Sequence, residues 1–102
     1  MRFQVNLQWP AQSLLGFDEM VAVEDLLIAK LSKQSEVGGH DFGSNETNIF
    51  IHTDDPRRAF EEIQIILSAH TMWPSAVVAY RQMDGSEYTV LWPHGSTTFD
   101  VR

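Results

Sequence analysis

The chain has 102 residues, 43% of them hydrophobic and 21% charged, a balance typical of one soluble globular domain. It contains no cysteine, which excludes disulfides, thiol nucleophiles and cysteine-ligated zinc. The net charge of −7 disfavours binding to nucleic acid or to anionic membranes, because phosphate contacts need clustered Lys and Arg.

The N-terminal segment, MRFQVNLQWP, alternates polar and apolar residues and predicts a strand that ends at its proline. Phe3, Val5 and Leu7 belong to the buried side, while Gln4 and Asn6 belong to the other. This alternation is unlike a signal peptide, and no stretch reaches the roughly 18 apolar residues of a membrane span. We therefore expect a cytoplasmic protein with a single domain over residues 1–102.

The next segment, FDEMVAVEDLLIAKLSK (residues 17–33), contains a predicted helix. Its apolar side chains recur at helical spacing, and the expected buried stripe consists of Met20, Val23, Leu27 and Leu31, widened by Leu26 and Ile28. Asp18 is the expected N-cap. Lys30 and Lys33 near the end suit the negative pole of the helix dipole.

A hairpin is predicted next, with a glycine-rich strand over 36–42 and a stronger strand over 48–53. If a tight turn lies at Ser44-Asn45, the positions of paired residues add to 89, and His52 then faces Val37. A wider loop would instead let His52 face His40. The turn geometry therefore decides whether the two histidines meet.

A second helix is predicted to begin at Pro56 and to run to about His70. Asp55 before the proline is a typical helix start, with a capping carboxylate and proline in the first turn. The expected buried stripe is Phe60, Ile63, Ile66 and Leu67.

Asp84-Gly85, between SAVVAYRQM and SEYTVLW, predicts a hairpin whose two central residues adopt positive φ. The expected pairs are Val77 with Trp92, Ala79 with Val90, and Arg81 with Tyr88. Both strands are apolar on both faces, and an apolar face is usually covered by a partner or a ligand. Residues 93–102 form a tail or an edge strand.

The order β-α-β-β-α-β-β predicts an α+β fold, with an antiparallel sheet and both helices on one face. Over residues 1–92 it resembles the ferredoxin-like architecture of small ACT-type domains, extended by a C-terminal strand. The resemblance implies that the first and third strands are central neighbours, with the 36–42 strand at one edge and the Asp84-Gly85 hairpin on the other side. Gln4 and Asn6 then lie beside Phe50 and His52 on the open face. No sequence motif accompanies the resemblance, so it implies a fold and no activity.

Groups capable of chemistry concentrate in GHDFGSNETNIFIHTDDPRR, residues 39–58. The candidate binding residues are His40, Asp41, Asn45, Glu46, His52 and Asp54. Histidine and carboxylate can ligate zinc, manganese or iron, but no HxH, HExxH or Asp-x-Asp spacing fixes two ligands together. We therefore predict no bound metal and no cofactor.

Arg57 and Arg58 follow the start of the second helix, where free backbone amides attract anions. Two arginines there oppose the helix dipole, so the sequence should compensate for them. Glu61 and Glu62 lie four positions further on and can form ion pairs with them. Ion pairing is the interpretation that we favour over an anion site.

Three functions are compatible with the sequence. The leading hypothesis is a non-catalytic binding or regulatory domain that forms a homodimer through the open sheet face, with an interface of Phe50, Tyr88, Val90 and Trp92. The first alternative is an acidic inhibitor or immunity-type protein that binds a basic protein partner. The second is a small enzyme using His52 with Asp41 or Asp54, although the sequence shows nothing that would tune their pKa values.

Overall fold

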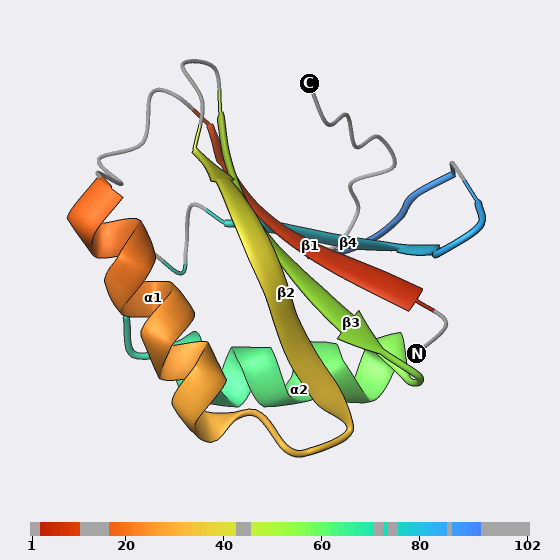
Figure 1. Cartoon of the computed structure of the whole chain (residues 1–102), viewed down its shortest axis with the longest axis horizontal. Helices are drawn as coiled ribbons and strands as arrows, with labels where there is room; N and C mark the ends of the chain where they lie inside the picture. Colours follow the sequence, from red (N-terminus) through yellow and green to blue (C-terminus); the bar gives the residue numbers. More distant parts are fainter. Residues whose placement is uncertain are drawn as a thin grey trace.

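The structure, a computed structural model, describes residues 3–10, 17–42, 46–70, 73, 76–85 and 87–92. The elements in chain order are β1 (Phe3–Pro10), α1 (Phe17–Lys30), β2 (Ser35–Phe42), β3 (Glu46–Thr53), α2 (Pro56–Leu67), β4 (Val77–Gln82) and β5 (Thr89–Trp92). The fold is α+β, with one five-stranded sheet and two helices (Figure 1). Neither described helix is long and apolar enough to cross a membrane. The predicted tail over residues 93–102 lies outside the described residues.

The strand order is β2-β3-β1-β4-β5, and every neighbouring pair is antiparallel. β1 and β3 are neighbours, with β2 at one edge and the β4–β5 hairpin on the other side, as predicted. A five-strand order is not the four-strand ferredoxin-like order. The structure therefore shows the α+β class and the antiparallel sheet, but it does not show the resemblance to the ferredoxin-like architecture.

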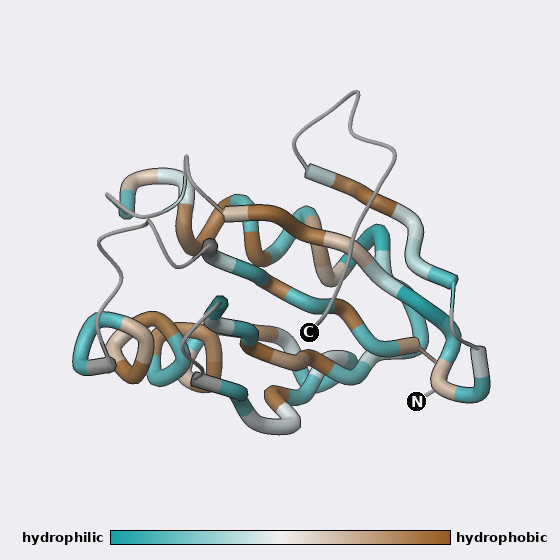
Figure 2. The backbone as a smooth tube through the Cα atoms, turned by 90° about the horizontal axis from the view of Figure 1, so that it is seen from above, coloured by the Kyte–Doolittle hydropathy of each residue, from teal (hydrophilic) through white to brown (hydrophobic). Residues whose placement is uncertain are grey.

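One hydrophobic core joins the sheet to both helices. Val5 and Leu7 of β1 belong to the same buried cluster as Met20 of α1 and Ile63 of α2. The other core residues are Trp9, Val23, Leu27, Ile49, Ile51, Ala59, Leu67, Trp73, Ala76, Val78 and Leu91. Hydrophobic and hydrophilic residues alternate along β1, and this alternation is visible in the hydropathy colours of Figure 2. The side chains that alternate with the core residues form the open face, with Gln4 paired to His52 and Asn6 paired to Phe50, as predicted.

The first helix differs from its prediction at both ends and on one side. It begins at Phe17 and ends at Lys30, so Asp18 lies in the first turn instead of capping it, and Lys33 lies beyond the end. Ile28 is 61% exposed, so its assignment to the buried stripe was wrong. Adjacent residues of a helix point about 100° apart, and Leu27 points into the core, so Ile28 points away from it.

The start of α2 confirms the predicted cap. The Asp55 side chain accepts a hydrogen bond from the Arg58 amide at 3.2 Å, and Pro56 occupies the first turn. The hydroxyl of Thr53 also accepts from the Asp55 amide at 3.1 Å, which fixes the link between β3 and α2. The helix ends at Leu67, earlier than the predicted His70.

Loss of this cap is expected to destabilise the fold. Asp55→Ala leaves a backbone amide of the first turn without its acceptor, and we expect the free energy of unfolding to fall by about 0.5–2 kcal/mol. Urea denaturation followed by circular dichroism measures the change. Asp55→Asn keeps the capping oxygen and should lose less; an equal loss in both variants would contradict a capping role.

The β4–β5 hairpin differs from its prediction in turn and in register. Asp84 and Gly85 do not have positive φ, and the Gly85 amide bonds the Gln82 carbonyl at 3.0 Å. Arg81 instead holds the turn. Its Nη1 donates hydrogen bonds of 3.0 Å each to the main-chain oxygens of Gln82, Met83 and Gly85. A local hydrogen-bonded turn thus replaces the positive-φ turn.

A β-bulge explains the altered register of this hairpin. Ala79 pairs with Val90 as predicted, but Trp92 pairs with Val78 instead of Val77. The bulge adds a residue to β5, so that two residues oppose one on β4. Trp92 consequently stacks on Trp73, with ring centroids 5.5 Å apart and planes at 19°.

Candidate functional site

The two histidines of the predicted cluster lie on opposite sides of the sheet. His40 pairs with the core residue Ile49 and reaches toward α1, where its Nδ1 lies 3.0 Å from a carboxylate oxygen of Glu24. His52 pairs with Gln4 and belongs to the open face. The two rings therefore do not converge on one ligand.

The β2–β3 register follows the tight-turn prediction only near the turn. Pairs add to 89 from Phe42 with Thr47 to Gly39 with Phe50, and the register then shifts between Val37 and Gly39. Beyond that shift His52 faces Glu36 instead of Val37. The His52 ring lies against Gly38. It is so close that a Cβ added to this glycine would be 2.5 Å from Cε1 of the ring.

Gly39 carries the backbone conformation that this irregularity requires. Its φ is +140°, a region that residues with a Cβ rarely adopt, and a Cβ there would meet no atom within 4 Å. We expect Gly39→Ala to cost about 1–2 kcal/mol through backbone strain alone. Gly85→Ala is the matched control, because its φ is unexceptional and its nearest contact is 3.6 Å. Chemical denaturation of both variants tests this, and equal stabilities would contradict it.

The acidic members of the cluster are dispersed. Asp41 is exposed and pairs with Asn48, which is four positions, or about 13 Å, along β3 from His52. Glu46 is half-buried at the start of β3, and Asp54 is exposed just after its end. Asn45 lies outside the described residues. Among the described residues, no three His, Asp or Glu side chains gather in a way that could hold a metal ion.

The arginines at the start of α2 are only partly paired. Arg58 Nε lies 3.4 Å from a Glu62 carboxylate oxygen, which confirms this predicted i,i+4 pair. Within the described part of the chain, Arg57 and Glu61 form no ion pair. Arg58 is therefore held in an ion pair, as the favoured interpretation requires, and Arg57 is not.

Glu62 makes further contacts that the sequence did not indicate. It accepts hydrogen bonds from the Ser32 amide at 2.9 Å and the Ser32 hydroxyl at 3.0 Å. Burial raises the pKa of Glu62, but the bonds from Ser32 and the nearby Arg58 outweigh it and hold the pKa below its ordinary value of 4.5. Glu62 thereby ties α2 to the segment that follows α1.

The centre of the open face carries two buried amides. Asn6 and Asn48 have no exposed surface, and their Oδ1 atoms accept from Gln4 Nε2 at 2.9 Å and from Gln8 Nε2 at 3.3 Å. Neither Nδ2 atom has an acceptor among the described residues. The alternation along the first strand predicted that Asn6 lies on the open face, whereas nothing in the sequence indicated that Asn48 is buried.

The described geometry thus leaves two features for function: an amide-lined sheet face and a hairpin with a hydrogen-bonded turn. It does not assemble the histidines and carboxylates into one reactive group. No family model, curated protein or solved structure matches this chain.

Proposed function

We propose that this chain is a small non-catalytic binding domain that forms a homodimer through the open face of its sheet. Four of the five strands, in the order β2-β3-β1-β4, are compatible with the ferredoxin-like arrangement expected from the sequence, and β5 is an additional strand at one edge. The separation of His40 from His52, and of His52 from Asp41, gives no support to the enzyme alternative.

The observation that carries the proposal is the pair of buried amides, Asn6 and Asn48, whose Nδ2 atoms find no acceptor among the described residues. A buried donor without an acceptor costs about 1–3 kcal/mol, so a partner that supplies acceptors gains that amount. A second copy supplies them, because an amide carries both donors and acceptors and a two-fold interface brings the same groups together. Asn6 and Asn48 have no exposed surface in one chain, so docking also requires the side chains around them to move aside.

Apolar residues on the same face add to this interface. Phe50 pairs with Asn6, Val90 pairs with Ala79, and both Phe50 and Val90 are half-buried. Tyr88 is half-buried just before β5. Trp92 stacks on Trp73 of the core, so we base the test of the interface on Phe50 instead.

Sedimentation of the full chain over a range of concentrations tests the dimer. We expect a dimer that persists at high salt, because its interface is apolar and amide-based. Phe50→Asp should shift the chain to a monomer with unchanged helical circular dichroism. Ile65→Asp is the matched control, since Ile65 is 78% exposed on α2 and lies outside this face. A wild-type chain that stays monomeric at high concentration would contradict the proposal.

One observation favours the acidic inhibitor as a second candidate. Glu36 and Asp41 are exposed on the edge strand β2, and the chain as a whole carries a net charge of −7. A basic protein partner would be attracted to this edge, and its association rate would fall as salt is added. A monomer with salt-sensitive binding to such a partner would favour the inhibitor over the dimer.

A further inference from the structure

The turn of the β4–β5 hairpin contains a sequence that can react with itself. Asp84 is the only Asp or Asn in the chain that is followed by glycine. Gly85 has no side chain to shield its amide nitrogen, and both residues are exposed to solvent. In a flexible chain, such a nitrogen can attack the carboxyl group of the preceding aspartate. The structure of the turn decides how readily this happens at Asp84.

The reaction has two steps, and water is its only co-reactant. In the first step the Gly85 nitrogen bonds Cγ of Asp84, and the hydroxyl of the carboxylic acid leaves as water with the amide hydrogen. The product is a five-membered cyclic imide. In the second step water adds to the main-chain carbonyl of the imide and breaks its bond to the nitrogen. The result is isoaspartate, in which the backbone runs through Cβ and Cγ.

The folded turn holds Asp84 in a conformation that does not allow the ring to close. Residues 82–85 form a β-turn, because the Gly85 amide donates to the Gln82 carbonyl at 3.0 Å. Neither Met83 nor Asp84 has a positive φ, which indicates a type I turn, with ψ of its third residue at about 0°. The closed ring instead requires Cβ and the Gly85 nitrogen to eclipse each other about the Cα–C bond. The planar peptide group between Asp84 and Gly85 must therefore rotate, and this rotation breaks the bond to Gln82.

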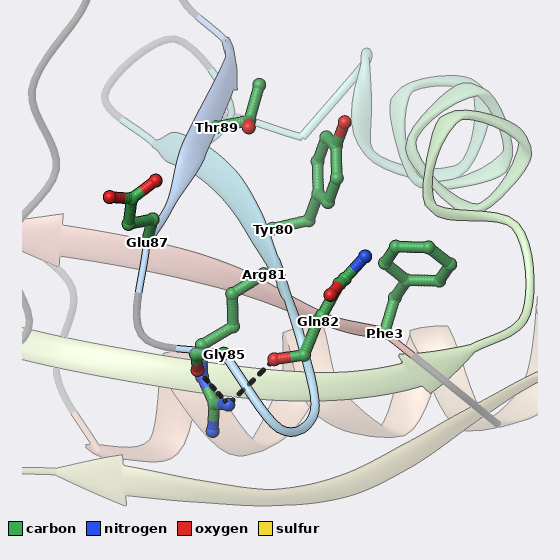
Figure 3. Close-up of a pocket in the computed structure, with 7 residues that line it drawn as sticks. All are labelled: Phe3, Tyr80, Arg81, Gln82, Gly85, Glu87 and Thr89. Atoms are coloured by element: carbon green, nitrogen blue, oxygen red, sulfur yellow. Dashed lines mark hydrogen bonds between the residues drawn. The ribbon is translucent and has the colours of Figure 1, made fainter.

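Arg81 restrains the peptide groups on both sides of the one that must rotate. Its Nη1 donates hydrogen bonds of 3.0 Å each to the carbonyls of Met83 and Gly85, and a third to the Gln82 carbonyl (Figure 3). The Met83 carbonyl belongs to the peptide group before the Asp84–Gly85 group, and the Gly85 carbonyl belongs to the one after it. Rotation of the middle group therefore disturbs the contacts of the guanidinium as well.

We propose that Asp84-Gly85 is a site of spontaneous isoaspartate formation that Arg81 suppresses in the folded chain. The reaction proceeds from a locally opened turn, so its rate follows the population of that open form. Isoaspartate adds one main-chain atom to the turn that leads into β5. The modification thus alters a hairpin that also carries the stack of Trp92 on Trp73, and it does not depend on the proposed homodimer.

Incubation of the full chain at neutral pH tests the site, with isoaspartate at Asp84 measured by chromatography and fragmentation mass spectrometry of its peptides. We expect slow conversion in the folded chain and much faster conversion in the same chain unfolded in guanidinium. Arg81→Met should raise the rate in the folded chain about fivefold, the change in open population expected when one hydrogen bond is lost. Gly85→Ala places a methyl group beside the nitrogen and should slow the reaction in both states.

Asp55→Ala is the matched control, because its expected loss of stability arises at the cap of α2 and leaves Arg81 unchanged. Local opening predicts the wild-type rate in this variant. An equal rise in Asp55→Ala and Arg81→Met would show that the reaction passes through global unfolding and would overturn the role of Arg81. Equal rates in the folded and unfolded wild-type chains would overturn the proposal as a whole.

A second substitution keeps the test valid if Arg81→Met fails to fold. Arg81→Lys retains a charged donor without the guanidinium, and we expect a smaller rise in the rate of isoaspartate formation. Circular dichroism shows whether each variant is folded. A folded variant of Arg81 that converts Asp84 no faster than the wild type would contradict the proposal.

Discussion

Replacement of Trp73 by alanine is expected to lower the free energy of unfolding by about 3–5 kcal/mol, the range for a large buried aromatic residue. Trp73 is 6% exposed and lies between two other rings. Its centroid is 5.5 Å from that of Trp92 and 6.5 Å from that of Phe60. The substitution thus removes the contact that joins α2 to β5 and leaves a cavity between them.

Guanidinium denaturation followed by far-ultraviolet circular dichroism measures this loss, independently of tryptophan fluorescence. Trp73→Phe keeps an aromatic ring and should lose clearly less than the alanine variant. Trp92→Ala should destabilise in the same direction, because it breaks the same stack. A loss below about 1 kcal/mol in Trp73→Ala would fall outside the range for a packed aromatic residue and would contradict its place in the core.

Glu62→Ala is expected to cost about 2–3 kcal/mol at neutral pH, because it removes an acceptor that is charged and serves three donors. The effect should depend on pH. The folded-state pKa of Glu62 lies below its ordinary value of 4.5, so the carboxylate stabilises the fold above that pH. The contribution is lost as the pH falls through the folded-state pKa.

Denaturation of wild type and Glu62→Ala between pH 7 and pH 3 checks both the size and the sign. The difference between the two proteins should be largest at neutral pH and should shrink on acidification. Glu61→Ala is the matched control, since Glu61 is exposed on the same helix and forms no hydrogen bond or ion pair with the described residues. A difference that grows toward low pH would contradict the assigned direction of the pKa.

Signals contained within one element predicted most of the fold. The alternation of Val5 and Leu7 with Gln4 defined both the strand and its buried face. Asp55 before a proline marked the start of α2 to the residue. Such signals succeed because strand pleating and helix capping are set by residues a few positions apart.

Features that depend on neighbours distant in the sequence were not predictable. The contact of Glu62 with Ser32 spans 30 positions, and nothing near either residue announces it. The bulge at Gly38 changed the partner of His52, although the turn alone had predicted the nearer pairs correctly. The bulge on β5 likewise moved Trp92 from its predicted pair with Val77 onto Trp73, because one extra residue alters every pairing beyond it.

The two β-bulges also affect whether copies of this chain can add to one another edge to edge without limit. An exposed edge strand offers a row of free backbone groups to which further strands can add, and this growth leads to fibrous aggregates. β2 interrupts that row at Gly38 and adds the charges of Glu36 and Asp41, while β5 spans only Thr89–Trp92 and is itself bulged. Strand addition is therefore disfavoured at both margins, and association through the open face would stop at two copies.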